Sequence, residues 1–145
     1  MENQNYKNHI RFYPAHHFVF YPITLILLVA SIYFAFKNEE QRAIWIFISI
    51  VISIIIWVAF MLRQHYSLIL QNRIVRLELR YRYFTLTGER LELLEDQLDD
   101  SKLFALRFAP DEELPGLVKR SISENLSGTA IKKSIKNWKG DYHRV

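Results

Sequence analysis

Two long apolar runs, separated by a short polar connector, restrict the possible folds of this chain more than any other feature. The first covers residues 18–36 (FVFYPITLILLVASIYFAF) and the second covers residues 43–62 (AIWIFISIVISIIIWVAFML), with KNEEQR between them. Neither run contains a charged residue. A helix needs about 20 apolar residues to cross the ~30 Å hydrocarbon layer of a bilayer. The pattern therefore predicts two membrane-spanning helices joined by a tight turn.

Two other interpretations of these runs fit the sequence less well. A chain of 145 residues is too short to bury two helices that are apolar on every side, which argues against a soluble core. The first run is longer than the apolar region of a signal peptide, and no small-x-small cleavage pattern follows it before Lys37. We therefore expect the first run to stay in the protein as a membrane span.

The positive charges near the spans predict the orientation of the chain. Lys7 and Arg11 precede the first span, and the connector holds only Lys37 and Arg42. Five arginines follow the second span within twenty residues: Arg63, Arg73, Arg76, Arg80 and Arg82. By the positive-inside rule, we expect both termini in the cytoplasm and the connector outside.

The rest of the chain predicts an all-α protein with three parts. Residues 1–17 form a cytoplasmic interfacial arm, residues 18–62 a transmembrane helical hairpin, and residues 63–145 a cytoplasmic helical domain of about four helices. The second span is expected to continue as a helix to about Tyr83, because apolar residues recur there at steps of four and three. These residues are Tyr66, Leu70, Ile74, Leu77, Tyr81 and Phe84. Further helices are expected at about 89–97, 101–109, 111–126 and 129–138.

Small residues in the two spans allow close helix contact. Ser49 and Ser53 lie four residues apart, while Ala30, Ser31 and Ala35 occur in the first span. They fit either packing of the two spans on each other or a face for the membrane helix of a partner. The spans contain no Asp, Glu, Lys, Arg or His, so a channel or pump built from this hairpin alone is disfavoured.

Charges segregate in the predicted cytoplasmic domain. Arg73, Arg76 and Arg80 form a stripe on the helix that leaves the membrane, and residues 89–100 are strongly acidic. The two segments could pair through leucines and opposite charge. Alternatively, the arginines, together with Arg63, could face phosphate headgroups while the acidic residues face water.

The C-terminal segment is basic and predicts a second contact surface. Lys132, Lys133, Lys136 and Lys139 lie on and just after the last predicted helix. A helix, a short turn and a basic amphipathic helix are also typical of a helix-turn-helix, which indicates nucleic acid as a possible partner. Base-edge readout would rest on Asn137 alone, so lipid or protein contact is favoured.

Histidines near the spans raise the question of a metal or haem site. His9, His16 and His17 precede the first span and His65 follows the second, which places all four on one predicted membrane face. No His-x-x-x-His pair or helix-borne glutamate partner supports such a site. The chain has no cysteine, which excludes thiolate chemistry and sulfur-ligated zinc. We expect no catalytic residue, no cofactor and no metal, and keep the histidine site as an alternative.

Three segments together resemble one known group of proteins. They are the opening QNYKNHIRFYPAHHFV, the exit from the second span LQNRIVRLELR, and the tail LRFAPDEELPGLVKR…IKKSIKNWKGDYHRV. The chain is similar over nearly its whole length to a family of small bacterial membrane proteins with two predicted spans, classed as a domain of unknown function. The resemblance implies a location in the bacterial inner membrane, and it implies no activity, cofactor or catalytic residue.

These observations favour a non-enzymatic membrane accessory or scaffold protein. Its cytoplasmic helices would dock a protein partner, either another membrane subunit or a second copy, and its basic surface would contact anionic lipid. The first alternative is a membrane-tethered nucleic-acid or ribosome-binding protein, and the second is the histidine-based metal or haem site.

Overall fold

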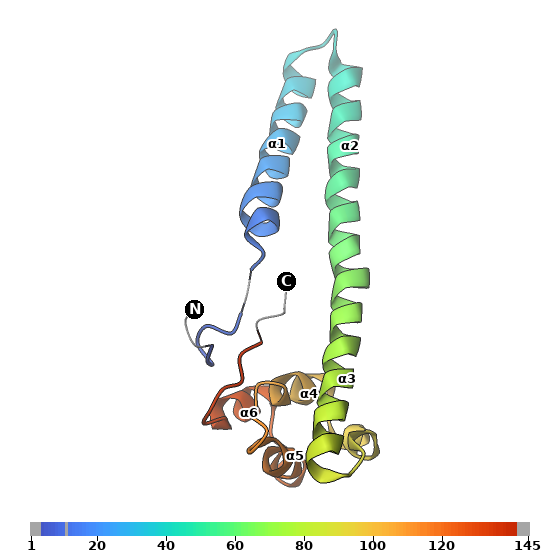
Figure 1. Ribbon diagram of the computed structural model, residues 1–145. Coiled ribbons are helices and arrows are strands. Elements are labelled where there is room, and N and C mark those ends of the chain that lie inside the picture. Colours follow the sequence, from blue (N-terminus) through green and yellow to red (C-terminus); the bar gives the residue numbers. More distant parts are fainter. Residues whose placement is uncertain (1–3, 11, 142–145) are drawn as a thin grey trace. The chain divides into compact units, whose positions relative to one another are not determined.

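The computed structural model describes residues 4–10 and 12–141, and every described element is helical. Arg11, counted above among the positive charges, and the last four residues of the tail motif lie outside the described residues. The elements in chain order are η1 (Ala15–Phe20), α1 (Tyr21–Lys37), α2 (Arg42–Met61), η2 (Leu62–Ser67), α3 (Leu68–Thr87), η3 (Leu91–Gln97), α4 (Asp100–Leu106), α5 (Leu114–Ser123) and α6 (Gly128–Ser134). The predicted all-α class is confirmed for these residues (Figure 1).

Two compact units divide the described chain. One runs from Phe12 to Ile69 and contains α1 and α2. The other combines the N-terminal arm with the chain from Leu70 onward. The boundary falls inside α3, close to the π-helical turns of η2.

In the first unit, α1 and α2 pack along a line of small residues. The hydroxyls of Ser31 and Ser49 lie 2.8 Å apart, and Ser31 and Ala35 are buried between the two helices. Small side chains let helix backbones approach closely, and hydroxyls add hydrogen bonds across the contact. Packing of the two helices on each other is therefore the use that the structure shows for these residues.

Gly88 sets the end of α3, which runs four residues beyond the predicted end at Tyr83. Gly88 has φ +72°, in the left-handed region that glycine adopts without a steric penalty, and its N–H donates to the Phe84 carbonyl at 2.8 Å. Thr87 is the last residue of α3. Its hydroxyl accepts a hydrogen bond from the Glu89 N–H, and the 3₁₀ turns of η3 begin only at Leu91.

The buried face of α3 in the second unit is formed by Val75, Leu79 and Tyr83. Leu79 and Tyr83 join leucines and Phe108 from the following helices in one apolar cluster. The six residues of the apolar stripe singled out from the sequence are all exposed. Five of them lie on the other side of α3, and Tyr66 lies before it in η2. The periodicity therefore identified the helix, while the core depends on a second set of apolar residues.

The last helix is shorter than predicted because the chain finds other hydrogen bonds. α6 ends at Ser134, and Ile135 is extended with φ −68° and ψ 123°. The Glu113 carboxylate accepts hydrogen bonds from the backbone N–H groups of Lys136 and Asn137 at 3.1 and 3.0 Å. The carboxylate satisfies donors that a longer helix would have directed to its own carbonyls.

Gly128 provides a test of how α6 packs. A Cβ atom at this position would lie 2.5 Å from the Ser101 carbonyl oxygen on α4. We expect Gly128→Ala to lower the free energy of unfolding by about 1–3 kcal/mol, because two backbone segments would have to separate. Thermal and denaturant unfolding of the full-length protein in detergent measures this loss.

Gly116 in α5 is the matched control, because a Cβ atom there would meet nothing within 4 Å. Gly116→Ala should leave stability unchanged or raise it by about 0.5–1 kcal/mol through helix propensity. Equal losses in the two variants would contradict the close contact at Gly128.

Candidate interaction surfaces

A carboxylate on η3 binds the arginine stripe of α3 within the second unit. Glu95 accepts two hydrogen bonds from the Arg80 guanidinium, from Nε and from Nη2, both at 2.6 Å. Arg76 Nη1 lies 3.5 Å from the same carboxylate, and Arg76 also pairs with Asp100. The Arg80 hydrogen bonds lower the pKa of Glu95 below its usual value, against the opposing effect of burial. Of the two arrangements left open by the sequence, the structure shows pairing between the basic and acidic segments.

A second charged cluster closes the loop before α5. Arg82 donates to Asp111 from Nε and Nη2 at 3.0 and 2.6 Å, and to the Ala109 carbonyl at 2.8 Å. Lys139 Nζ lies 3.5 Å from the same Asp111 carboxylate oxygen. These cations lower the pKa of Asp111, with the Arg82 hydrogen bonds contributing most. Lys139 therefore takes part in tying the C-terminal segment to the domain.

The predicted contact residues thus differ in what surrounds them. Arg76, Arg80 and Lys139 are engaged within the domain, and Arg63 lies on η2 in the other unit. Arg73 is exposed on α3 and makes no ion pair with any described residue. Contact of these residues with lipid or with a partner stays a prediction.

Lysines from two distant parts of the sequence line an open groove in the second unit. Lys7, from the N-terminal arm, lies with Lys132 and Lys133 around the rings of Tyr6 and Trp138. The ammonium group of Lys133 is 5.5 Å from the centre of the Tyr6 ring. We call this feature the lysine groove. Sequence reasoning missed Lys7, because only the folded chain brings the arm beside α6.

The four histidines do not form a recognisable metal site. His9 belongs to the second unit, where its ring contacts Phe108 and Trp138, with centroids 5.8 Å apart in each case. His16 and His17 lie in η1 and His65 in η2. Across the described residues, no three His, Cys, Asp or Glu side chains are grouped so that they could hold a metal ion.

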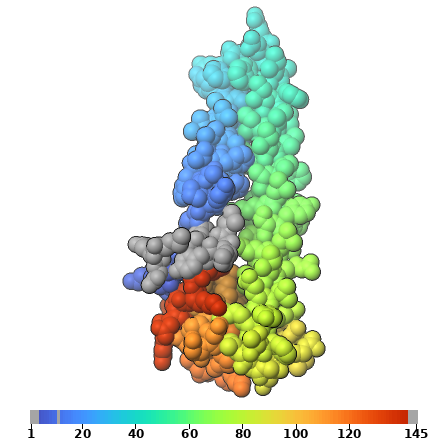
Figure 2. All heavy atoms as spheres, viewed as in Figure 1, coloured from blue at the N-terminus to red at the C-terminus, as the bar shows by residue number. Residues whose placement is uncertain are grey.

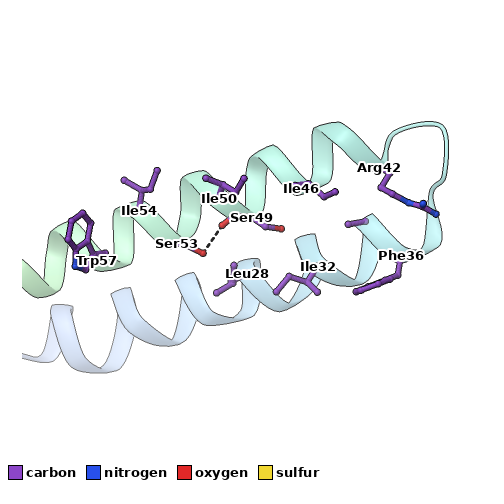
Figure 3. Close-up of a pocket in the computed structure, with 11 residues that line it drawn as sticks. Leu28, Ile32, Phe36, Arg42, Ile46, Ser49, Ile50, Ser53, Ile54 and Trp57 are labelled. Atoms are coloured by element: carbon purple, nitrogen blue, oxygen red, sulfur yellow. Dashed lines mark hydrogen bonds between the residues drawn. The ribbon is translucent and has the colours of Figure 1, made fainter.

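The two apolar helices carry a groove of their own (Figure 3). The residues that line it are Leu28, Ile32, Ala35 and Phe36 of α1, and Arg42, Ile46, Ser49, Ile50, Ser53, Ile54 and Trp57 of α2. The Ser53 hydroxyl is already bonded, since it donates to the Ser49 carbonyl at 2.8 Å. The lining is apolar apart from the two serines and the arginine at the start of α2, so it offers van der Waals contact to lipid chains or to another apolar helix.

The fold and these surfaces define a class: an all-helical protein in which two helical runs, Ala15–Lys37 and Arg42–Thr87, are long and apolar enough to cross a membrane. The chain belongs to the family of unknown function DUF6526, whose model matches residues 1–145. This agrees with the resemblance drawn from the sequence motifs. No curated protein and no solved structure gives a significant match.

The ion pair of Glu95 predicts that the free energy of unfolding depends on pH. Because the pKa of Glu95 is lowered on folding, its contribution to stability is present above the unfolded pKa and is lost as the pH falls through the folded pKa. We expect Glu95→Gln to lower the free energy of unfolding at neutral pH by about 1–3 kcal/mol, since bonds to a charged group are lost. The difference from wild type should vanish at acidic pH.

Unfolding curves of both proteins at a series of pH values measure this difference. Glu112→Gln is the control, because Glu112 is exposed and forms no ion pair with a described residue. Its effect should stay near zero at every pH. A loss for Glu95→Gln that persists undiminished in acid would contradict the ion pair as its cause.

Proposed function

We propose that this protein is a non-enzymatic scaffold or accessory protein of the bacterial inner membrane. In this proposal α1 and α2 form a transmembrane hairpin, both termini are cytoplasmic, and the helical domain from α3 onward docks a protein partner and contacts anionic lipid.

The surface of α1 and α2 is the observation that carries the proposal. Large apolar side chains are exposed around both helices, and none of the most apolar stretch of the second run is buried within the chain. Such a surface is unfavourable in water by about 25 cal/mol for each Å² of apolar area. Monomeric soluble proteins rarely expose a continuous apolar surface that extends over two helices. A bilayer removes this cost.

The hydroxyl groups of these helices support the same conclusion. The serine and threonine hydroxyls of α1 and α2 are Thr24, Ser31, Ser49 and Ser53. Each donates to a backbone carbonyl three or four residues earlier in the same helical run at 2.8 or 2.9 Å. Hydrocarbon provides no alternative partner for a polar group, so internal satisfaction is what a membrane requires.

The absence of cysteine from the sequence makes the topology directly testable. Glu40→Cys places a thiol in the connector, and Glu112→Cys places one on the helical domain. In intact cells, a membrane-impermeant maleimide should label the first variant and should label the second only after the membrane is permeabilised. The reverse pattern would invert the topology, and labelling of both positions in intact cells would remove the hairpin.

The lysine groove is the surface that we assign to anionic lipid. Three lysines and two aromatic residues line the groove, which fits a phosphate headgroup because cations attract anionic lipid and amphipathic rings favour the headgroup level. Tyr6 and Lys7 come from the arm that the sequence predicts at the interface.

We expect the double substitution Lys7→Gln with Lys133→Gln to weaken the binding of phosphatidylglycerol to the detergent-purified protein about 30-fold, at roughly 1 kcal/mol for each of the two cations. Native mass spectrometry counts the bound lipids. Lys119→Gln, which changes an exposed lysine of α5 outside the groove, is the control. Equal lipid retention in all three proteins would remove this surface from the proposal.

No specific observation favours the alternatives. The nucleic-acid hypothesis needs its lysines on one helix, but α6 ends at Ser134, before Lys136 and Lys139. The metal hypothesis has no grouped ligands within the described residues. We therefore propose neither as the function.

A further inference from the structure

We infer that α3 is a dimerisation helix, and that its exposed apolar stripe pairs with the same stripe of a second copy as a short parallel coiled coil. The inference deepens the proposed function and rests on it, because it names the partner of one face of the membrane-anchored domain.

The stripe has the spacing of a coiled-coil seam. Its members in the second unit are Leu70, Ile74, Leu77, Tyr81 and Phe84, which are between 54% and 70% exposed. Their steps of four, three, four and three repeat every seven residues, as the a and d positions of a heptad do. Ile74 and Tyr81 take the a positions, and the others take the d positions. Ile74 at a with Leu70 and Leu77 at d is the combination that favours two strands, and the second heptad carries the aromatic residues Tyr81 and Phe84.

The stripe has no partner within the described chain, while the opposite side of α3 is fully used. Val75, Leu79 and Tyr83 are buried, and Leu79 and Tyr83 belong to the apolar core of the domain. At 3.6 residues per turn, these three residues lie on the side of the helix opposite Ile74 and Leu77. In Figure 2 part of α3, coloured light green, is left uncovered by the other segments of the domain. The helix is thus held in place by one face and presents the other.

The charges beside the stripe identify the occupant. In this register Arg73 takes position g and Glu78 takes the e position five residues later. In a parallel two-stranded coiled coil, position g of one helix lies beside position e of the next heptad on the partner. Arg73 of one copy would therefore meet Glu78 of the other, twice by symmetry.

The ion pairs within the described domain do not include Arg73 or Glu78. The charged residues of α3 are Arg73, Arg76, Glu78, Arg80 and Arg82. Arg76, Arg80 and Arg82 form ion pairs inside the domain, whereas Arg73 and Glu78 are exposed and pair with no described residue.

The same charges disfavour other arrangements of the stripe. An antiparallel pair would bring g positions together, which would place Arg73 or Arg80 near arginines of the partner. A stripe lying on anionic lipid would bring the Glu78 carboxylate to a negative surface. The parallel arrangement also fits two copies anchored in one membrane with the same topology.

The seam is short, and anchoring compensates for this. Two heptads are too few to hold free helices together, but α3 is already helical through its packing on the domain. Confinement of both copies to one membrane raises their effective concentration, which favours weak contacts of this kind.

Cysteine crosslinking in membranes tests the inference, since the chain has no cysteine of its own. Leu77→Cys and Phe84→Cys place thiols on the seam. Leu86→Cys is the control, because Leu86 is an exposed residue of α3 away from the stripe. We expect oxidation of the membranes to give a disulfide-linked species of twice the chain mass with both seam variants and little with the control.

Charge reversal tests the register. Arg73→Glu or Glu78→Arg alone, each in the Leu77→Cys background, should lower the dimer fraction about fivefold, because each leaves like charges in both symmetric pairs. The double reversal should restore it. No response to either reversal, or crosslinking of the Leu86 variant to the same extent as the seam variants, would overturn the inference.

Carbonate extraction of the same membranes separates the two proposals. If carbonate releases the chain, the membrane-anchored function fails. If the chain stays in the membrane but the seam cysteines form no dimer, or link only to a different protein, the function stands and self-association through α3 is wrong.

Discussion

The attachment of α3 to the following helices is the contact on which the rest of the second unit depends. Leu79 and Tyr83 bring the helix into the core, and Arg80 holds the 3₁₀ segment that carries Glu95. Burial of apolar surface supplies the free energy of this contact, while the guanidinium and carboxylate fix its register. Because α3 is bound through this face, its opposite face points away from the core.

The two units achieve their packing by different means. In the unit with α1 and α2, small residues and hydroxyls allow close contact between helices that are otherwise apolar all round. In the other unit, leucines and Phe108 fill a conventional core that charged residues surround. This division fits the proposed placement of α1 and α2 in a membrane, because hydrocarbon cannot drive apolar helices together whereas water can.

Sequence patterns correctly predicted the helical class and the helical structure of the two long apolar runs. An apolar run of about twenty residues has few alternatives to a helix. Residues such as Asp99, which caps the start of α4, and Gly88, which follows the end of α3, mark helix ends through local interactions. The core was harder to predict. Two apolar sets share α3, and nothing local distinguishes the exposed Leu77 from the buried Leu79. That choice depends on the leucines of later helices, which is information held far away in the chain.

The candidate surfaces, too, could be predicted from the sequence only in part. The basic character of the arginine stripe and of the C-terminal segment was evident from composition, but the pairing of Arg76 and Arg80 with Glu95 was one of two open options. The lysine groove could not be predicted, because Lys7 and Lys133 are far apart in sequence. Side chains of one charge are easily counted, whereas their neighbours across the fold are set by tertiary packing.

The distribution of contacts along α3 also has a mechanical consequence. Its buried residues and ion pairs begin at Val75 and Arg76 and continue to Tyr83. Among the described residues, the turns from Leu68 to Ile74 have neither a fully buried side chain nor an ion pair, so fewer contacts with the domain resist bending there. α3 is therefore fixed to the domain along its second half only. A force applied sideways to the domain would bend the helix where these contacts begin, just before Val75.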